Sequence, residues 1–234
     1  MKKIIDYNEY EINTLPYELA IQYDNRTYCE YYISLLRTKH NLILSFYYNK
    51  DYNSKIIKID LFFIGFTIYY IVNALFYNDA TMHNIYIKKG AFDIEYQLPK
   101  IIYSSLISIV LNTLLKYIAL TNDGIIDFKQ SKKKKGLMKL GEDLYSKLRI
   151  KFVLFFILSF ILLLFFWYYI SMFCAIYRNT QYHLLKDTLI SFGLSLLYPF
   201  DINLLPGIFR IPSLSKPKKK RECLYKFSKI LQFF

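Results

Sequence analysis

The chain has 234 residues, of which 54% are hydrophobic and 19% aromatic, and its formal net charge is +13. The hydrophobic share exceeds the roughly 45–50% of ordinary globular domains, so a typical soluble domain is not the expected class. The basic residues flank apolar segments, so the expected partners are anionic lipid headgroups and not nucleic acid.

The sequence contains no recognisable catalytic or metal-binding motif. Its three cysteines are scattered without a CxxC pair, and no histidine stands at metal-ligand spacing. HExxH, GxSxG and P-loop motifs are missing as well. We therefore expect no catalytic residue, no metal site and no cofactor.

Residues 1–57 are predicted to form a cytoplasmic N-terminal segment. Its first residues lack an apolar stretch, so a signal peptide is not expected. Residues 31–48 are apolar but interrupted by Arg37, Lys39 and His40, and the charge-free part is too short to cross a bilayer. This pattern favours a short amphipathic helix in the membrane interface, with a helix packed on the protein itself as the alternative.

Residues 58–121 are predicted to hold transmembrane helices one and two. The uncharged stretch 61–77 is at the short end of what can cross a bilayer. A polar loop follows, and Pro99 is expected to begin the second helix, because the first helical position needs no N–H group. The second apolar stretch, 101–120, contains one charge, Lys116.

Residues 122–149 are predicted to form a basic cytoplasmic linker, the last part of which is a helix that enters the next span. That span, Phe152 to Tyr177, contains no charged residue and is bracketed by Lys151 and Arg178. An apolar run of more than about 18 residues is typical of a transmembrane helix, whereas helices of soluble proteins are usually amphipathic.

Residues 150–210 are predicted to hold transmembrane helices three and four, joined by a short turn. The fourth, 188–209, contains Asp201 and two prolines, which favours a broken helix. His183 and Asp187 stand four residues apart in the turn, which would place them on one helix face. A solvated turn is the favoured interpretation of this pair, and a proton relay is the other.

Residues 211–234 are predicted to form a basic cytoplasmic tail. Most of the 31 Lys and Arg residues fall in the N-terminal segment, the linker and this tail, which four spans place on one side of the membrane. The positive-inside rule makes that side the cytoplasm. The predicted fold is therefore all-α, an integral membrane four-helix bundle with a short interfacial N-terminal helix and both termini cytoplasmic.

Two basic runs are candidate sites for anionic lipid, although their simpler interpretation is as solvated topology signals. They comprise Lys132, Lys133, Lys134, Lys135, Lys218, Lys219, Lys220 and Arg221. Cys223 follows the second run and is a candidate for S-palmitoylation.

An intramembrane pair is predicted between Lys116 and Asp201. A lone carboxylate inside a span costs about 2.5–3.5 kcal/mol on insertion scales, so Asp201 needs a partner or water. Lys116 lies toward the same side of the membrane, and a long lysine stem can reach along a helix. The alternative is that the fourth helix ends at Pro199 and that Asp201 lies among headgroups.

Four stretches of the chain resemble the membrane region of polycystin-type proteins, the receptor-like members in which paired helices follow a lipoxygenase-homology domain. These stretches are His40–Ser45 with Ser54–Lys58, Asn73–Tyr77, Tyr103–Ser105 and Leu184–Phe192, the last leading to Pro199. The likeness covers residues 36–209 and includes the order of two helices, a basic linker and two more helices. The chain is also similar to uncharacterised multi-pass membrane proteins of protists.

The six-helix channel portion of polycystins and a complete lipoxygenase-homology domain are missing from this chain. The resemblance therefore carries over no pore or ligand residue, and it implies a helical accessory or docking module, in keeping with a fragment of a longer gene product. The expected function is that of a structural or channel-associated membrane subunit without catalysis. Its expected partners are the bilayer, anionic lipids, and a larger membrane protein or a second copy of itself. The alternative is a small transporter or ion channel with a pathway at the fourth helix.

Overall fold

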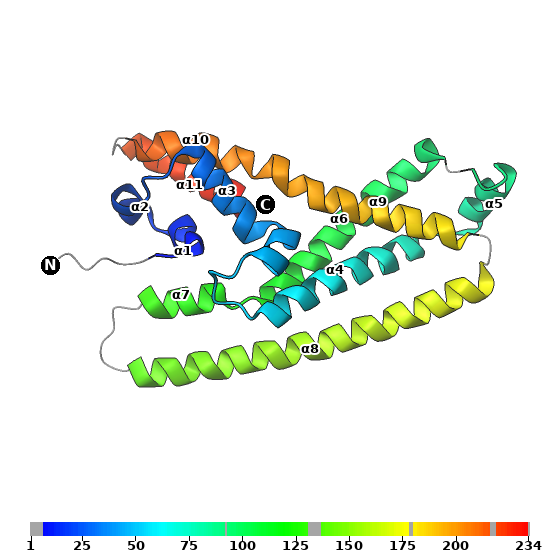
Figure 1. Cartoon of the computed structure of the whole chain (residues 1–234), viewed down its shortest axis with the longest axis horizontal. Helices are drawn as coiled ribbons and strands as arrows, with labels where there is room; N and C mark the ends of the chain where they lie inside the picture. The colour runs from blue at the N-terminus through cyan, green and yellow to red at the C-terminus, as the bar shows by residue number, and fades with distance from the viewer. Residues whose placement is uncertain (1–6, 92, 131–136, 178–179, 216–218, 234) are drawn as a thin grey trace. The chain divides into compact units, whose positions relative to one another are not determined.

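The structure is a computed structural model of the whole chain, and it describes residues 7–91, 93–130, 137–177, 180–215 and 219–233 (Figure 1). All regular structure in these residues is helical, which confirms the all-α prediction. The elements are α1 (Glu9–Thr14), α2 (Tyr17–Tyr23), α3 (Tyr28–Lys39), the π-helix η1 (Ile43–Tyr47), α4 (Lys55–Leu75), α5 (Asp79–Ile87), α6 (Ile94–Ala119), α7 (Asn122–Gln130), α8 (Leu137–Ile176), α9 (Gln181–Ile202), α10 (Leu204–Leu214) and α11 (Lys219–Phe233).

Four helical segments are long and apolar enough to cross a membrane. They are Lys55–Leu75, Ile94–Ala119, Met138–Ile176 and Gln181–Leu214. Each overlaps one of the four predicted spans over nearly its whole length, so the number and order of the apolar helices were correctly predicted.

The chain divides into two compact units. Unit 1 consists of Met1–Lys55, Asn122–Gln130 and Leu196–Phe234, and unit 2 consists of Ile56–Thr121 and Ser131–Ser195. The boundary between them falls inside α9. Unit 2 therefore contains most of the apolar helices, and unit 1 gathers segments that are far apart in the sequence.

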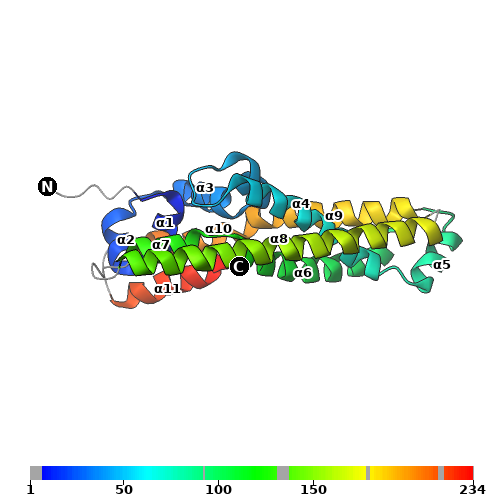
Figure 2. The same ribbon diagram turned by 90° about the horizontal axis from the view of Figure 1, so that it is seen from below.

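The core of unit 2 is built where α4, α6 and α8 meet. Ile64 and Ile68 of α4, Leu115 of α6 and Phe155 of α8 belong to one buried apolar cluster. Figure 2 shows α8 running alongside α6, and the two helices are in contact. A second apolar cluster joins α4, α5, α8 and α9 at the other end of the unit and consists of Ala74, Tyr77, Ile85, Phe173 and Leu184.

The start of α6 differs from the prediction. The helix begins at Ile94, and the side chain of Asp93 accepts a hydrogen bond from the Tyr96 N–H at 3.4 Å as its N-cap. Pro99 therefore lies inside the helix and does not begin it. Because it is close to the N-terminus, it removes only one backbone hydrogen bond near the end of the ladder.

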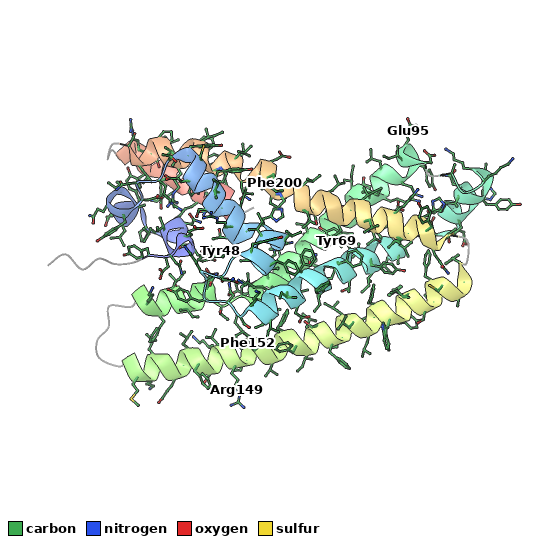
Figure 3. All side chains as sticks on the ribbon, in the orientation of Figure 1. Tyr48, Tyr69, Glu95, Arg149, Phe152 and Phe200 are labelled. Carbon is green, nitrogen blue, oxygen red and sulfur yellow. The ribbon has the colours of Figure 1, made fainter. Side chains whose placement is uncertain are left out.

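Two parts of the predicted basic linker are helical. Residues 122–130 form α7, and α8 begins at Leu137 and continues without a break through the long apolar span. The 40 residues of α8 extend about 60 Å at 1.5 Å per residue, roughly twice the thickness of a bilayer core. The first turns of α8 carry exposed charge, including Arg149, which points away from its Phe152 neighbour in Figure 3.

The fourth apolar segment is interrupted at Asn203 and not at Pro199. The helix α9 continues past Pro199 to Ile202, and α10 begins at Leu204. The Pro199 carbonyl accepts two hydrogen bonds from Asn203, one from its side chain at 2.7 Å and one from its backbone N–H at 3.3 Å. The alternative in which the helix ends at Pro199 is wrong. The segment is divided as predicted, but at Asn203 and not at a proline, because Pro199 lies within α9 and Pro206 within α10.

Unit 1 is organised around α3 and α10, which are in contact, and α10 and α11 lie side by side in Figure 1. Tyr31 and Leu35 of α3 are fully buried, whereas Ile33 is exposed. The helix therefore packs against the protein along one face, as in the alternative interpretation of residues 31–48. An interfacial location stays a prediction for its other face.

Candidate functional site

The helix α6 has an unusual distribution of polar and apolar side chains. Its buried face contains four polar residues at helical spacing: Gln97, Ser104, Ser108 and Asn112. Its exposed surface carries large apolar side chains, among them Ile102, Leu106, Val110 and Leu114. This is the reverse of a helix on the surface of a soluble protein, and it is the arrangement expected where lipid surrounds the bundle and polar groups pair inside it.

A buried polar cluster centred on Asn73 joins α4, α6 and α9 within unit 2. The Asn73 Oδ1 atom accepts hydrogen bonds from the hydroxyls of Ser104 at 2.7 Å and Ser191 at 3.4 Å. Its Nδ2 group donates to the carbonyl of Tyr69, which is labelled in Figure 3, at 2.8 Å. The Tyr69 ring lies against Phe192 of α9. One amide side chain thus connects three apolar helices.

Helices α4 and α6 also approach each other closely at Gly65 and Asn112, about two turns from the polar cluster around Asn73. A Cβ atom placed on Gly65 would lie 3.0 Å from Oδ1 of Asn112. The Asn112 amide also donates to the Ser108 carbonyl at 2.9 Å, which fixes the orientation of the side chain. Gly65 therefore leaves the room that the Asn112 side chain occupies.

Asp187 is a buried carboxyl group one turn before Ser191 on α9. It is 2% exposed, and its Oδ2 atom accepts a hydrogen bond of 2.6 Å from the Tyr77 hydroxyl. His183, one turn earlier, is buried as well. The interpretation of His183 and Asp187 as parts of a solvated turn is therefore wrong, because α9 begins at Gln181 and turns both side chains into unit 2.

Lys100 of α6 lies close to this carboxyl group and is held by other residues. Its ammonium group donates to the Thr81 hydroxyl and lies 4.2 Å from the centroid of the Tyr96 ring. No ion pair between Lys100 and Asp187 is present among the described residues. Asp187 therefore has a phenol as its hydrogen-bonding partner in the described part of the chain.

The two residues of the predicted intramembrane pair belong to different units of the structure. Lys116 is half-buried on α6 in unit 2, and Asp201 is exposed near the end of α9 in unit 1. Because the two residues belong to different units, the contact between them stays a prediction. The exposed side chain of Asp201 is compatible with a headgroup location.

The predicted lipid-binding residues are only partly described. Lys132, Lys133, Lys134, Lys135 and Lys218 lie outside the described residues. Lys219 and Lys220 are in the first turn of α11, while Arg221 donates to the Pro212 carbonyl at 3.1 Å and to the Ser215 hydroxyl at 2.7 Å. Cys223 is an exposed free thiol, as palmitoylation would require.

Unit 1 contains a buried ionic network that sequence analysis missed. Arg210 is 0% exposed, and its Nε atom donates to Asp24 at 2.9 Å. Arg26 holds the other carboxylate oxygen of Asp24 through its Nε atom at 2.7 Å. The Arg210 guanidinium group also lies 4.9 Å from the ring centroids of both Tyr31 and Tyr225. No local pattern could indicate this network, because Arg210 and Asp24 are 186 residues apart.

The electrostatics of Asp24 follow from this geometry. Burial acts against its charged form, but the hydrogen bond from Arg26 and the charge of Arg210 outweigh this effect and hold the pKa of the carboxyl group below its usual value. Further donations from Arg210 go to the carbonyls of Ile12 and Asn13, at 2.8 and 3.1 Å. The network therefore ties α10 to the N-terminal helices.

A second polar contact ties α7 to the N-terminal helices. The Lys129 ammonium group donates to Glu11 at 2.7 Å and to the Tyr52 hydroxyl at 2.6 Å. The pKa of Glu11 is lowered, because these contacts and the backbone N–H of Asn8 outweigh the opposing effect of its burial. The basic linker thus begins with a helix that packs within unit 1.

Among the described residues, no three His, Cys, Asp or Glu side chains are grouped so that they could hold a metal ion. Comparison of the chain with protein-family models, with curated proteins and with solved structures finds no match. The resemblance to polycystin-type membrane regions therefore stays a prediction.

Proposed function

We propose that this protein is a multi-pass membrane protein that acts as a structural or channel-associated subunit and has no catalytic activity. The observation that carries this proposal is the distribution of polarity in unit 2, where polar side chains such as Asn73 and Ser104 pair inside and apolar ones face outward. In water such a surface would be unstable, whereas a bilayer solvates it and strengthens the need for internal pairing.

The helix α8 supports the subunit role. It contributes Phe155, Ser159 and Phe173 to the interior of unit 2 and leaves most of its apolar span exposed. Exposed side chains along this helix include Val153, Leu154, Phe156, Ile157, Phe160, Ile161, Leu164, Trp167 and Tyr168. A surface of this kind can be covered by lipid or by the helices of a neighbouring membrane protein.

The orientation and the partners belong to the same proposal. Both termini lie in the cytoplasm, and the basic linker and tail face anionic lipid there. The partner of the apolar surface is a larger membrane protein, of the polycystin type, or a second copy of this chain. These statements rest on the charge distribution and on the resemblance of residues 36–209.

Affinity purification from native membranes in mild detergent, after chemical cross-linking, tests the subunit role. We expect a larger membrane protein or a second copy of the chain to co-purify in fixed ratio. The purified chain alone, reconstituted in liposomes, should conduct no ions above the level of empty liposomes. Ion flux through the chain alone would contradict the subunit proposal.

A second candidate function is a small transporter or ion channel, and the buried Asp187 favours it. Ionisable residues inside apolar helices commonly mark ion and proton pathways. Flux that is present in liposomes and lost in Asp187→Asn would support this function, whereas flux that Asp187→Asn leaves unchanged would contradict a pathway at this site.

A further inference from the structure

The two oxygens of the Asp187 carboxyl group have different surroundings. Oδ2 accepts the hydrogen bond from the Tyr77 hydroxyl at 2.6 Å. Oδ1 is buried and has no hydrogen-bond partner among the described residues. A carboxylate accepts hydrogen bonds at both oxygens and is unfavourable in a dry apolar site when one of them stays unpaired.

Within the described ranges, no ion pair to Asp187 is found on the helices that face it. Tyr77, from the turn after α4, is a neutral donor. The positive charge of Lys100 acts on Asp187 at a distance, but its ammonium group is bound to the Thr81 hydroxyl of α5. The nearest basic group on α6 therefore lowers the energy of the anion without supplying a donor to Oδ1.

The remaining neighbours are aromatic or lie on α9 itself. Phe173 of α8 belongs to the same apolar cluster as Tyr77, and Tyr177, the residue after α8, packs against it. On α9, His183 precedes Asp187 by one turn, and Lys186 is adjacent in sequence with its ammonium group over the Tyr182 ring. Neither the α8 side nor the α9 side provides a donor to Oδ1 among the described residues.

We propose that Asp187 is a proton-binding site, in which Oδ1 takes one proton from water and releases it again. A single O–H bond is formed and broken, and no electrons are exchanged. Protonation removes the charge from the buried carboxyl group and gives Oδ1 a hydrogen of its own. The Tyr77 hydroxyl continues to donate to Oδ2 in both states.

The site has a direct consequence for the bundle. Asp187 is one turn from Ser191, which is hydrogen-bonded to Asn73 of α4. A charge that appears at Asp187 changes the electrostatic energy where α4, α6 and α9 meet, so pH is coupled to the packing of these helices. The inference rests on the proposed membrane location of α9 and holds for a subunit and for a transporter alike.

Infrared difference spectroscopy of the full-length protein in lipid nanodiscs tests the proposal, because a protonated carboxyl group has its own C=O stretching band. The spectrum is recorded from about pH 2, well below the ordinary aspartate pKa, to about pH 9, where buried carboxyl groups can titrate. We expect an acid band with a midpoint above about pH 5, higher than the ordinary aspartate value of about 3.9. The band should disappear in Asp187→Asn.

Two variants serve as controls. Asp201→Asn removes an exposed carboxyl group from the same helix and should leave the band unchanged. Tyr77→Phe retains Asp187 and removes the donor to Oδ2, so the midpoint should rise by about one pH unit. This variant keeps the test decisive if Asp187→Asn does not fold.

Three results would overturn the proposal. One is an Asp187 band with a midpoint at or below the ordinary aspartate value. Another is a midpoint that Tyr77→Phe does not move. The third is a midpoint that falls when K⁺ is replaced by Na⁺ at constant ionic strength, since a metal ion and not a proton would then occupy the site. None of these readings depends on ion flux or on a partner protein, so the proposed function is tested separately.

Discussion

The side chains that decide stability in unit 1 are a few buried charges. Arg210 is enclosed by two tyrosine rings, a carboxylate and two backbone carbonyls. Arginine suits this position because its planar fork of donors matches several acceptors at once. Burying such charges has a desolvation cost, but removing one partner destabilises the fold more, because it leaves the other charge buried without compensation.

Arg210→Ala is expected to lower the free energy of unfolding by about 3–5 kcal/mol, because it leaves Asp24 and two carbonyls without a donor. Denaturant unfolding followed by circular dichroism measures this change. Lys226→Ala removes an exposed partner of Glu222 on the neighbouring α11 and should leave stability nearly unchanged, because solvent screens this ion pair. Equal effects of the two substitutions would contradict the assigned role of Arg210.

The pKa of Asp24 leads to a prediction about pH. Because the folded-state pKa lies below the unfolded one, Asp24 contributes stability that is present above the ordinary aspartate pKa of about 3.9 and lost as pH falls through the lower folded value. Unit 1 should therefore lose stability in acid below about pH 4. In Asp24→Asn this acid-dependent loss should be smaller, as measured by unfolding at a series of pH values.

At the scale of helices, close packing depends on a glycine that leaves room for a side chain of a neighbouring helix. A Cβ atom on Gly207 of α10 would lie 2.6 Å from Cε2 of Tyr28, whose hydroxyl donates to the Leu204 carbonyl at 2.9 Å. Gly193 of α9 has nothing within 4 Å of the same position. The two glycines therefore have opposite roles, although both stand in the fourth apolar segment.

Gly207→Ala is expected to destabilise the protein by about 1–3 kcal/mol, because the Tyr28 ring must move away from α10. Gly193→Ala should be neutral or stabilising by up to about 1 kcal/mol, since alanine favours a helix and meets no neighbour. Thermal unfolding of both variants in detergent provides the comparison. Tyr28→Ala should reduce the effect of Gly207→Ala, and purely additive effects would contradict a contact between the two positions.

The basic run at residues 132–135 leads to a prediction for the linker that contains it. A peptide of residues 129–151 should bind phosphatidylserine vesicles and dissociate in high salt, because each basic residue near the surface contributes about 1 kcal/mol. Replacement of its four consecutive lysines by glutamine should weaken binding strongly. Equal binding to neutral vesicles would exclude an electrostatic origin.

At the scale of the whole molecule, the topology can be tested at a single sequon. Asn25 is exposed and begins the sequence Asn25-Arg26-Thr27, an N-glycosylation acceptor. With the N-terminus in the cytoplasm this site never meets the lumen, so we expect no glycan on Asn25 in cells that glycosylate. A mobility shift that glycosidase removes and Asn25→Gln abolishes would reverse the proposed orientation.

The sequence by itself determined the helical class and the number of long apolar helices. Both follow from local properties. An uncharged run such as Phe152–Tyr177 forms a helix in apolar surroundings, because a helix pairs all of its backbone groups within the segment. Boundaries were less well determined. Pro99 was expected to begin a helix, and in the alternative interpretation Pro199 ended one, yet both prolines lie inside helices.

Only the tertiary structure decided which polar residues meet. Asn73, Ser104 and Ser191 come from three helices, and their contacts depend on the rotation of each helix about its axis, which a nearly uniform apolar sequence does not specify. The burial of Asp187 likewise depends on where α9 begins and on the turn that carries Tyr77. The ion pair between Arg210 and Asp24 joins the two ends of the chain, so it becomes apparent only when α10 packs against the N-terminal helices.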